Sequence, residues 1–152
     1  MKKNKFSKNW IIKQKRDVYV KKSKLEGYRS RAVYKLQEIN EKFNIIKNNT
    51  LVVDLGAAPG SWSQYISRNY KSSKIISIDL KDIEPIKNLF HIKGDFTQDD
   101  QKIKIQNYFG KKVDLIMSDM AVNTTGYKNL DSVVTGELCL DALKFAKDLL
   151  YL

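Results

Sequence analysis

The sequence predicts an α/β fold with a mostly parallel, doubly wound sheet, and three observations lead to this fold class. Short apolar segments typical of buried strands alternate along the chain with longer segments typical of helices. The first of these strands, 51–55, runs directly into a glycine turn and the start of a helix. Acidic residues follow the predicted strands at Asp54, Asp79, Asp95 and Asp119, and ligands bind at such strand ends.

Two helices are predicted in the N-terminal third of the chain. Lysine, asparagine and serine dominate 1–9, which we expect to be disordered, and 14–24 is predicted to form a basic helix. The next predicted helix, 31–43, is amphipathic, and Ser30 is placed to cap it. Its apolar face is formed by Val33, Leu36, Ile39 and Phe43.

The rest of the chain alternates between strands and helices. Apolar runs predict strands over 51–55, 74–78, 89–92 and 113–117, with helices over 61–69, 99–108 and 131–150. Loops are predicted at 48–49, around Pro85 and over 124–129, where turn-forming residues gather. The last helix presents Leu138, Ala142, Phe145 and Leu149 on one face. Cys139 lies within this helical pattern, and we expect its thiol to be buried and inert.

The positive charge is concentrated at the N-terminus. Residues 1–35 hold thirteen Lys and Arg and two acidic residues, which equals the net charge of the whole chain, +11. A solvated lysine-rich tail is one reading of this segment. Aromatic residues are interleaved with the cations, however, at Phe6, Trp10, Tyr19, Tyr28 and Tyr34. Cations for phosphates and flat rings for bases favour a second reading, in which 1–35 is a basic RNA-binding arm that includes the start of the first core helix. Residues 36–152, which hold the glycine turn and the strand-end aspartates, are then expected to form the ligand-binding domain.

Several classes of protein are disfavoured by composition. The 152 residues suffice for one domain with a sizeable core, and no apolar run approaches the length of a membrane span. The basic N-terminus lacks the apolar segment of a secretory signal. A single cysteine and a single histidine, His91, argue against disulfides and a metal site, so we expect a cytoplasmic protein without metal.

The most informative stretch is the glycine turn and its flanks, which read D-L-G-A-A-P-G-S-W-S-Q over 54–64. The short form D-x-G-x-x-x-G differs from the dinucleotide fingerprint G-x-G-x-x-G, which is absent. Gly56 and Gly60 let the backbone turn sharply and approach a ligand. A helix that begins at Ser61 would present its N-terminal N–H groups to that ligand.

This long string resembles the FtsJ/RrmJ-type family of RNA 2′-O-methyltransferases. Further matches follow in the family's order: Y-R-S-R-A-V-Y-K-L over 28–36, I-D-L over 78–80, G-D-F over 94–96 and M-S-D-M-A-V-N over 117–123. The resemblance implies a Rossmann-like methyltransferase fold that binds S-adenosylmethionine. It also implies methylation of a uridine ribose in large-subunit ribosomal RNA, with ribosomal RNA or the large subunit as partner.

The resemblance also assigns roles to individual residues. It implies a cofactor site of Asp54, Gly56, Gly60, Trp62, Asp79, Asp95 and Asp119, catalytic roles for Lys35 and Asp119, and RNA contacts from Arg29, Arg31 and Lys35. Asp79 would accept the ribose hydroxyls of the cofactor, and Asp95 the adenine amino group. Simpler readings remain beside these: a helix-capping or turn residue for Asp79, a turn residue for Asp95, a core residue for Trp62 and a solvated lysine for Lys35.

The chain also departs from the family pattern. The family's Lys-Asp-Lys-Glu set is matched by Lys35 and Asp119, whereas its second Lys and its Glu have no counterpart here. No segment after the strand over 113–117 can pair with it, so we expect a chain that lacks its C-terminal strands and self-associates through this edge. Ser61 and Val122 replace the family's usual Gly and Pro.

Two other functions compete with the enzyme reading. A truncated, catalytically impaired remnant that binds RNA and cofactor fits the missing Lys and Glu, and little methyl transfer is then expected. A nicotinamide-dependent oxidoreductase is disfavoured by the basic arm and by the missing G-x-G-x-x-G.

Overall fold

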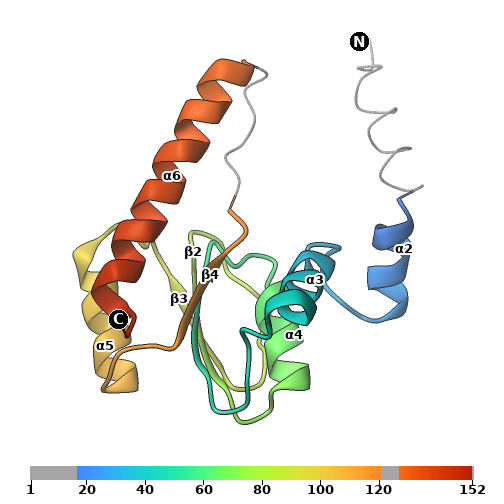
Figure 1. Ribbon diagram of the computed structural model, residues 1–152, viewed down its shortest axis with the longest axis horizontal. Helices are drawn as coiled ribbons and strands as arrows, with labels where there is room; N and C mark the ends of the chain where they lie inside the picture. Colours follow the sequence, from blue (N-terminus) through green and yellow to red (C-terminus); the bar gives the residue numbers. More distant parts are fainter. Residues whose placement is uncertain (1–16, 121–126, 152) are drawn as a thin grey trace.

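The computed structural model describes residues 17–120 and 127–151, apart from the side chains of residues 128 and 129. A four-stranded sheet lies in the middle, with α3 and α4 on one face and α5 and α6 on the other (Figure 1). All strand pairs are parallel, and the strand order is β3-β2-β1-β4. The order reverses between β1 and β4, which is where ligands bind in sheets of this kind. The predicted α/β class with a parallel sheet is confirmed.

The elements lie close to their predicted positions. The strands are β1 (Leu51–Leu55), β2 (Lys74–Asp79), β3 (Leu89–Lys93) and β4 (Leu115–Ser118). The helices are α2 (Val18–Leu25), α3 (Val33–Phe43), α4 (Ser61–Asn69), α5 (Asp99–Phe109) and α6 (Lys128–Leu149). The predicted disorder of 1–9 and part of the predicted loop over 124–129 lie outside the described residues.

Alternation along the strands divides the core between the two faces of the sheet. Val52 and Ile75 pack toward α3 and α4, where they meet Ile66. Their neighbours Val53 and Ile76 point to the opposite face. That second core is completed by Ile105 of α5 and by Phe145 and Leu149 of α6. Burial on both faces explains why the strands read as continuous apolar runs.

Only half of the residues predicted for the apolar face of α3 are buried. Val33 and Leu36 are buried, but Ile39 and Phe43 are exposed. Asn40 is buried in their place, and its Oδ1 accepts the N–H of Ile46 at 2.8 Å. The face therefore turns toward Asn40 because this amide fixes the chain as it leaves the helix.

Two local predictions are wrong. Ser30 is not the N-cap of α3, since that position belongs to Ala32. Its Oγ accepts the N–H of Ala32 at 3.2 Å in the turn before the helix and also pairs with the hydroxyl of Ser61 at 2.6 Å. Cys139 is exposed rather than buried. Leu138 and Ala142 pack against the core together with Phe145 and Leu149, but Cys139 lies beside this face of α6 and is left uncovered.

The last strand has an open edge in the described part of the chain. β4 pairs with β1 on one side, and no described strand lies on its other side. Val113, predicted as its first residue, instead forms an isolated bridge with Leu150. Self-association through this edge stays a prediction.

We expect alanine at Gly56 to destabilise the fold more than alanine at Gly110. Both glycines have positive φ, +66° and +67°, so both substitutions meet the same backbone strain of about 1–2 kcal/mol. A Cβ at Gly110 would meet nothing within 4 Å, whereas a Cβ at Gly56 would overlap the side chain of Met120. Overpacking adds about 1–3 kcal/mol. Urea unfolding of Gly56→Ala and Gly110→Ala tests this, and equal losses of unfolding free energy would contradict it.

Candidate functional site

Three of the four predicted strand-end aspartates gather around one hollow of about 610 Å³. Its walls come from the ends of all four strands and from the glycine turn between β1 and α4. Of the predicted cofactor residues, it is lined by Gly56, Asp79, Asp95 and Asp119, together with Met120 and Leu138. Asp54, Gly60 and Trp62 are not among its lining residues. The topology thus brings together four of the seven residues.

Asp79, at the end of β2, holds the glycine turn in place. Its Oδ2 accepts the backbone N–H of Ala58 at 2.9 Å, and its Oδ1 accepts that of Lys81 at 2.8 Å. The carboxylate is half-buried and faces the hollow. Asp79 is therefore a turn-forming residue that also lines the hollow, and its binding of ribose hydroxyls stays a prediction.

Asp95, which follows β3, is an exposed turn residue on the rim of the same hollow. Its Oδ1 accepts the backbone N–H of Thr97 at 2.9 Å and the Thr97 hydroxyl at 2.8 Å. These hydrogen bonds, the backbone one first, hold the pKa of Asp95 below its usual value. Asp95 is therefore a fixed anion beside the hollow.

Asp54, in β1, lies beneath the turn instead of facing the large hollow. It is 2% exposed, and its Oδ2 accepts the hydroxyl of Ser63 at 2.6 Å. The pKa of Asp54 is raised to about 7, chiefly by burial; the hydrogen bonds from Ser63 oppose this rise, and the charges of Asp119 and Asp79 add to it. Asp54 thus secures the first turn of α4 from below.

The buried carboxyl of Asp54 predicts a pH-dependent stability. Its pKa rises from 3.8 in the unfolded chain to about 7 in the folded one, so the folded state binds the proton more tightly. The free energy of unfolding should therefore fall as pH rises from about 4 to about 7. Between about pH 5 and about pH 8 the loss is about 2–3 kcal/mol, since one pKa unit corresponds to about 1.4 kcal/mol.

Asp54→Asn removes this titration and serves as the matched variant. We expect urea unfolding to show a smaller loss of stability between these two pH values in Asp54→Asn than in the wild-type chain. Parallel pH profiles for the two proteins would show that Asp54 is already ionised in the folded state at the lower pH.

Trp62, on the first turn of α4, is a core residue. It is 9% exposed, packs with Leu36 and Ile66, and donates its indole N–H to the carbonyl of Ala32 at 2.8 Å. This bond joins the start of α4 to the start of α3. The simpler of its two readings fits the structure, and direct contact with a cofactor stays a prediction.

Lys35 and Asp119 form an ion pair across the site. The Nζ of Lys35, on α3, lies 2.7 Å from the Oδ1 of Asp119, which follows β4. The two side chains are 64% and 30% exposed. Asp119 also lines the large hollow, so the pair stands at its edge, open to a large substrate.

The two arginines predicted to contact RNA are held by the protein. Arg29 donates to the carbonyls of Pro59, at 3.0 Å, and Pro85, at 3.2 Å, and so joins the glycine turn to the loop before β3. Arg31 pairs with Asp17, the N-cap of α2. Sequence reasoning missed both contacts, because the partners are distant in the chain or are backbone atoms. Contact with RNA stays a prediction for both residues.

Within 17–120 and 127–151, no group of His, Cys, Asp and Glu side chains is arranged to hold a metal ion. None of the described helices is both long and apolar enough to span a bilayer.

Comparison with known proteins gives one consistent result. Residues 28–151 match the model of the FtsJ-like methyltransferase family. A ribosomal RNA large subunit methyltransferase E from Pelagibacter ubique is 59% identical over 150 residues, which cover 99% of this chain and 74% of the relative. The protein of the same name from Rickettsia akari is 48% identical over 146 residues, or 92% of this chain. The chain spans only 64% of that relative's length.

A solved structure shows the same fold. The crystal structure of a ribosomal RNA methyltransferase from Plasmodium falciparum superposes with a TM-score of 0.75 at 38% sequence identity. The match covers 82% of this chain and 74% of the other. The Rossmann-like fold expected from the sequence is thus found in a solved relative.

Proposed function

Since this chain belongs to the FtsJ-like methyltransferase family, we propose that it transfers a methyl group from S-adenosylmethionine to a ribose 2′-hydroxyl of large-subunit ribosomal RNA. One observation supports this most strongly: the Lys35–Asp119 ion pair stands where the strand-end hollow opens to the surface. A hollow for a small donor and an open edge for a large acceptor are the two sites that such a transfer needs.

The residues around the large hollow fit S-adenosylmethionine. A volume of about 610 Å³ falls within the usual range of small-ligand sites, about 300–1,000 Å³. Asp79, Asp95 and Asp119 give it an acidic wall, which suits hydroxyl and amino donors and the positive charge of a sulfonium. When bound, the sulfonium group supplies a methyl carbon already activated for displacement. Asp79 would accept the ribose hydroxyls, and Asp95 the adenine amino group.

The protein itself must orient the acceptor hydroxyl and assist the loss of its proton. A lysine ammonium has three N–H donors, and one of those of Lys35 is used by Asp119. The others have no partner among the described residues and would bind ribose oxygens, while Asp119 fixes the direction of the side chain. Lys35 and Asp119 would therefore position the ribose, as the family resemblance implies.

The basic N-terminus is proposed to supply most of the affinity for RNA. Residues 1–16 hold seven Lys and Arg and no acidic residue. Each phosphate contact with single-stranded nucleic acid contributes about 0.7 to the slope of log affinity against log salt. We expect a chain that lacks residues 2–16 to bind ribosomal RNA more weakly and with a clearly smaller slope. Equal slopes for the two chains would mean that the segment is only a solvated tail.

The proposed function is tested first by ligand choice. Calorimetry should show binding of S-adenosylmethionine and none of NAD, whereas the reverse would restore the oxidoreductase reading. If ribosomal RNA is the methyl acceptor, the protein is also expected to work in the cytoplasm. Methyl incorporation into ribosomal particles then separates an active enzyme from a remnant that only binds its ligands.

A further inference from the structure

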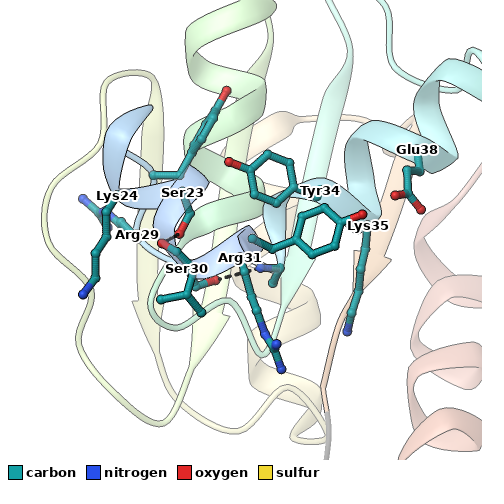
Figure 2. Close-up of a pocket in the computed structure, with 12 residues that line it drawn as sticks. Ser23, Lys24, Arg29, Ser30, Arg31, Tyr34, Lys35 and Glu38 are labelled. Carbon is teal, nitrogen blue, oxygen red and sulfur yellow. Dashed lines mark hydrogen bonds between the residues drawn. The ribbon is translucent and has the colours of Figure 1, made fainter. Parts of the chain in front are cut away.

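A second hollow, of about 590 Å³, lies between α2 and the start of α3 (Figure 2). Three tyrosines line it, Tyr19, Tyr28 and Tyr34. Lys35 lines it as well, and its ion-pair partner Asp119 lines the large hollow. The Lys35–Asp119 pair therefore stands between the two hollows. We call this second hollow the tyrosine hollow.

A small hollow of about 50 Å³ connects the two. It shares Ser30 and Ala32 with the tyrosine hollow, and it shares Gly56, Ala58 and Asp119 with the large one. The three hollows thus share walls one after another, and the ion pair stands beside them. A strand of RNA that places a ribose at the pair would pass directly over the tyrosine hollow.

Of the three tyrosines that line the tyrosine hollow, Tyr19 offers a ring to a ligand. Tyr34 is buried, its hydroxyl donates to Glu26 at 3.0 Å, and burial with this hydrogen bond raises its pKa to about 12. Its ring is in contact with those of Tyr19, at 5.4 Å between centroids, and Tyr28, at 6.5 Å. Tyr19, by contrast, is 50% exposed. Tyr34 supports the wall from behind, and Tyr19 offers a ring on which a base can stack.

Cations surround the mouth of the tyrosine hollow. Lys24, Arg31 and Lys35 extend to the same side of the helices (Figure 2). Arg31 and Lys35 are paired with Asp17 and Asp119, whereas Lys24 makes no ion pair or side-chain hydrogen bond with any described residue. Lys24 is thus available to a phosphate.

We propose that the tyrosine hollow holds a nucleotide next to the one that is methylated, with its base stacked on Tyr19 and its phosphate at Lys24. The proposal rests on the proposed function, because the target ribose must lie at the Lys35–Asp119 pair. Stacking on an aromatic ring beside cations is how single-stranded RNA is held with little dependence on sequence.

The test measures binding of a short, labelled single-stranded RNA to the full chain by fluorescence anisotropy. Tyr19→Ala should weaken binding about 5- to 150-fold, the equivalent of one stacked base, without changing the salt slope. Tyr19→Phe keeps the ring and should bind like the wild-type chain. Lys24→Gln should lower the slope by about 0.7, since one phosphate contact is lost. Tyr108→Ala is the matched control, because Tyr108 is also 50% exposed but lies on α5, across the sheet.

Two measurements, donor binding and RNA binding, distinguish failure of this inference from failure of the proposed function. Calorimetry with S-adenosylmethionine should give the same affinity for all four variants. If Tyr19→Ala binds RNA as the wild-type chain does, the tyrosine hollow is not a nucleotide site, although the proposed function stands. If Tyr108→Ala weakens RNA binding as much as Tyr19→Ala does, the inference is also overturned. If the wild-type chain binds neither RNA nor donor, the proposed function falls, and this inference falls with it.

Discussion

Substitution of Lys35 by methionine is expected to lower the rate of methyl transfer about 10²-fold, because loss of the group that positions the ribose displaces the acceptor hydroxyl from its productive geometry. Methionine keeps most of the length of the side chain and removes the ammonium that lies 2.7 Å from Asp119. The side chain is 64% exposed, so we expect little change in stability. Single-turnover incorporation of tritiated methyl into undermethylated large subunits measures the rate.

The control for Lys35→Met is Lys42→Met, on the same helix. Lys42 lies in the last turn of α3 and contacts the exposed ring of Phe43, away from the ion pair. Asp119→Asn should reduce the rate in the same direction as Lys35→Met, because it removes the partner that orients the lysine. If Lys35→Met transfers methyl as fast as Lys42→Met, the ribose is positioned by other groups.

Substitution of Asp79 by alanine should weaken the binding of S-adenosylmethionine about 5- to 150-fold. Loss of an acceptor in a half-buried site costs about 1–3 kcal/mol, because the hydrogen-bond donors of the ligand are left without a partner. The same change also releases the N–H of Ala58 in the glycine turn, which Asp79 holds at 2.9 Å. Both effects act in one direction, and calorimetry measures their sum.

Asp82→Ala provides the comparison for Asp79→Ala. Asp82 is three residues further along the chain, is exposed and pairs with Lys93 at 2.6 Å outside the hollow. Its removal should leave the affinity for S-adenosylmethionine unchanged. Equal affinities for the wild-type chain and Asp79→Ala would remove the proposed role of this carboxylate.

Much of the fold was predictable because it follows from short-range patterns. The strand cores around Val52, Val53 and Ile76 are apolar in unbroken runs, which only burial on both faces explains. The α6 residues Phe145 and Leu149 follow helical spacing, and both reach the core. The gathering of Asp79, Asp95 and Asp119 around one hollow followed from the topology, since parallel strands end at one edge of the sheet.

Contacts between distant parts of the chain could not be predicted in this way. Arg29 looked like a free cation for RNA, but its guanidinium binds backbone carbonyls 30 and 56 residues away. On α3, Asn40 is buried where two apolar residues were predicted to be, because its amide holds the chain at Ile46. Cys139 lies beside the apolar face of α6 that contains Leu138 and Ala142, and whether a neighbouring element covers such a flanking position is not specified by helical spacing.

Identification of the methylated product tests the central claim most directly. The chain, in excess, is incubated with tritiated S-adenosylmethionine and undermethylated large ribosomal subunits, and the RNA is digested to nucleosides. The expected result is label in a 2′-O-methylated uridine, at a rate that falls when Lys35 is replaced. Label in a methylated base, or no label from a chain that binds both S-adenosylmethionine and RNA, would contradict ribose methylation at the Lys35–Asp119 pair.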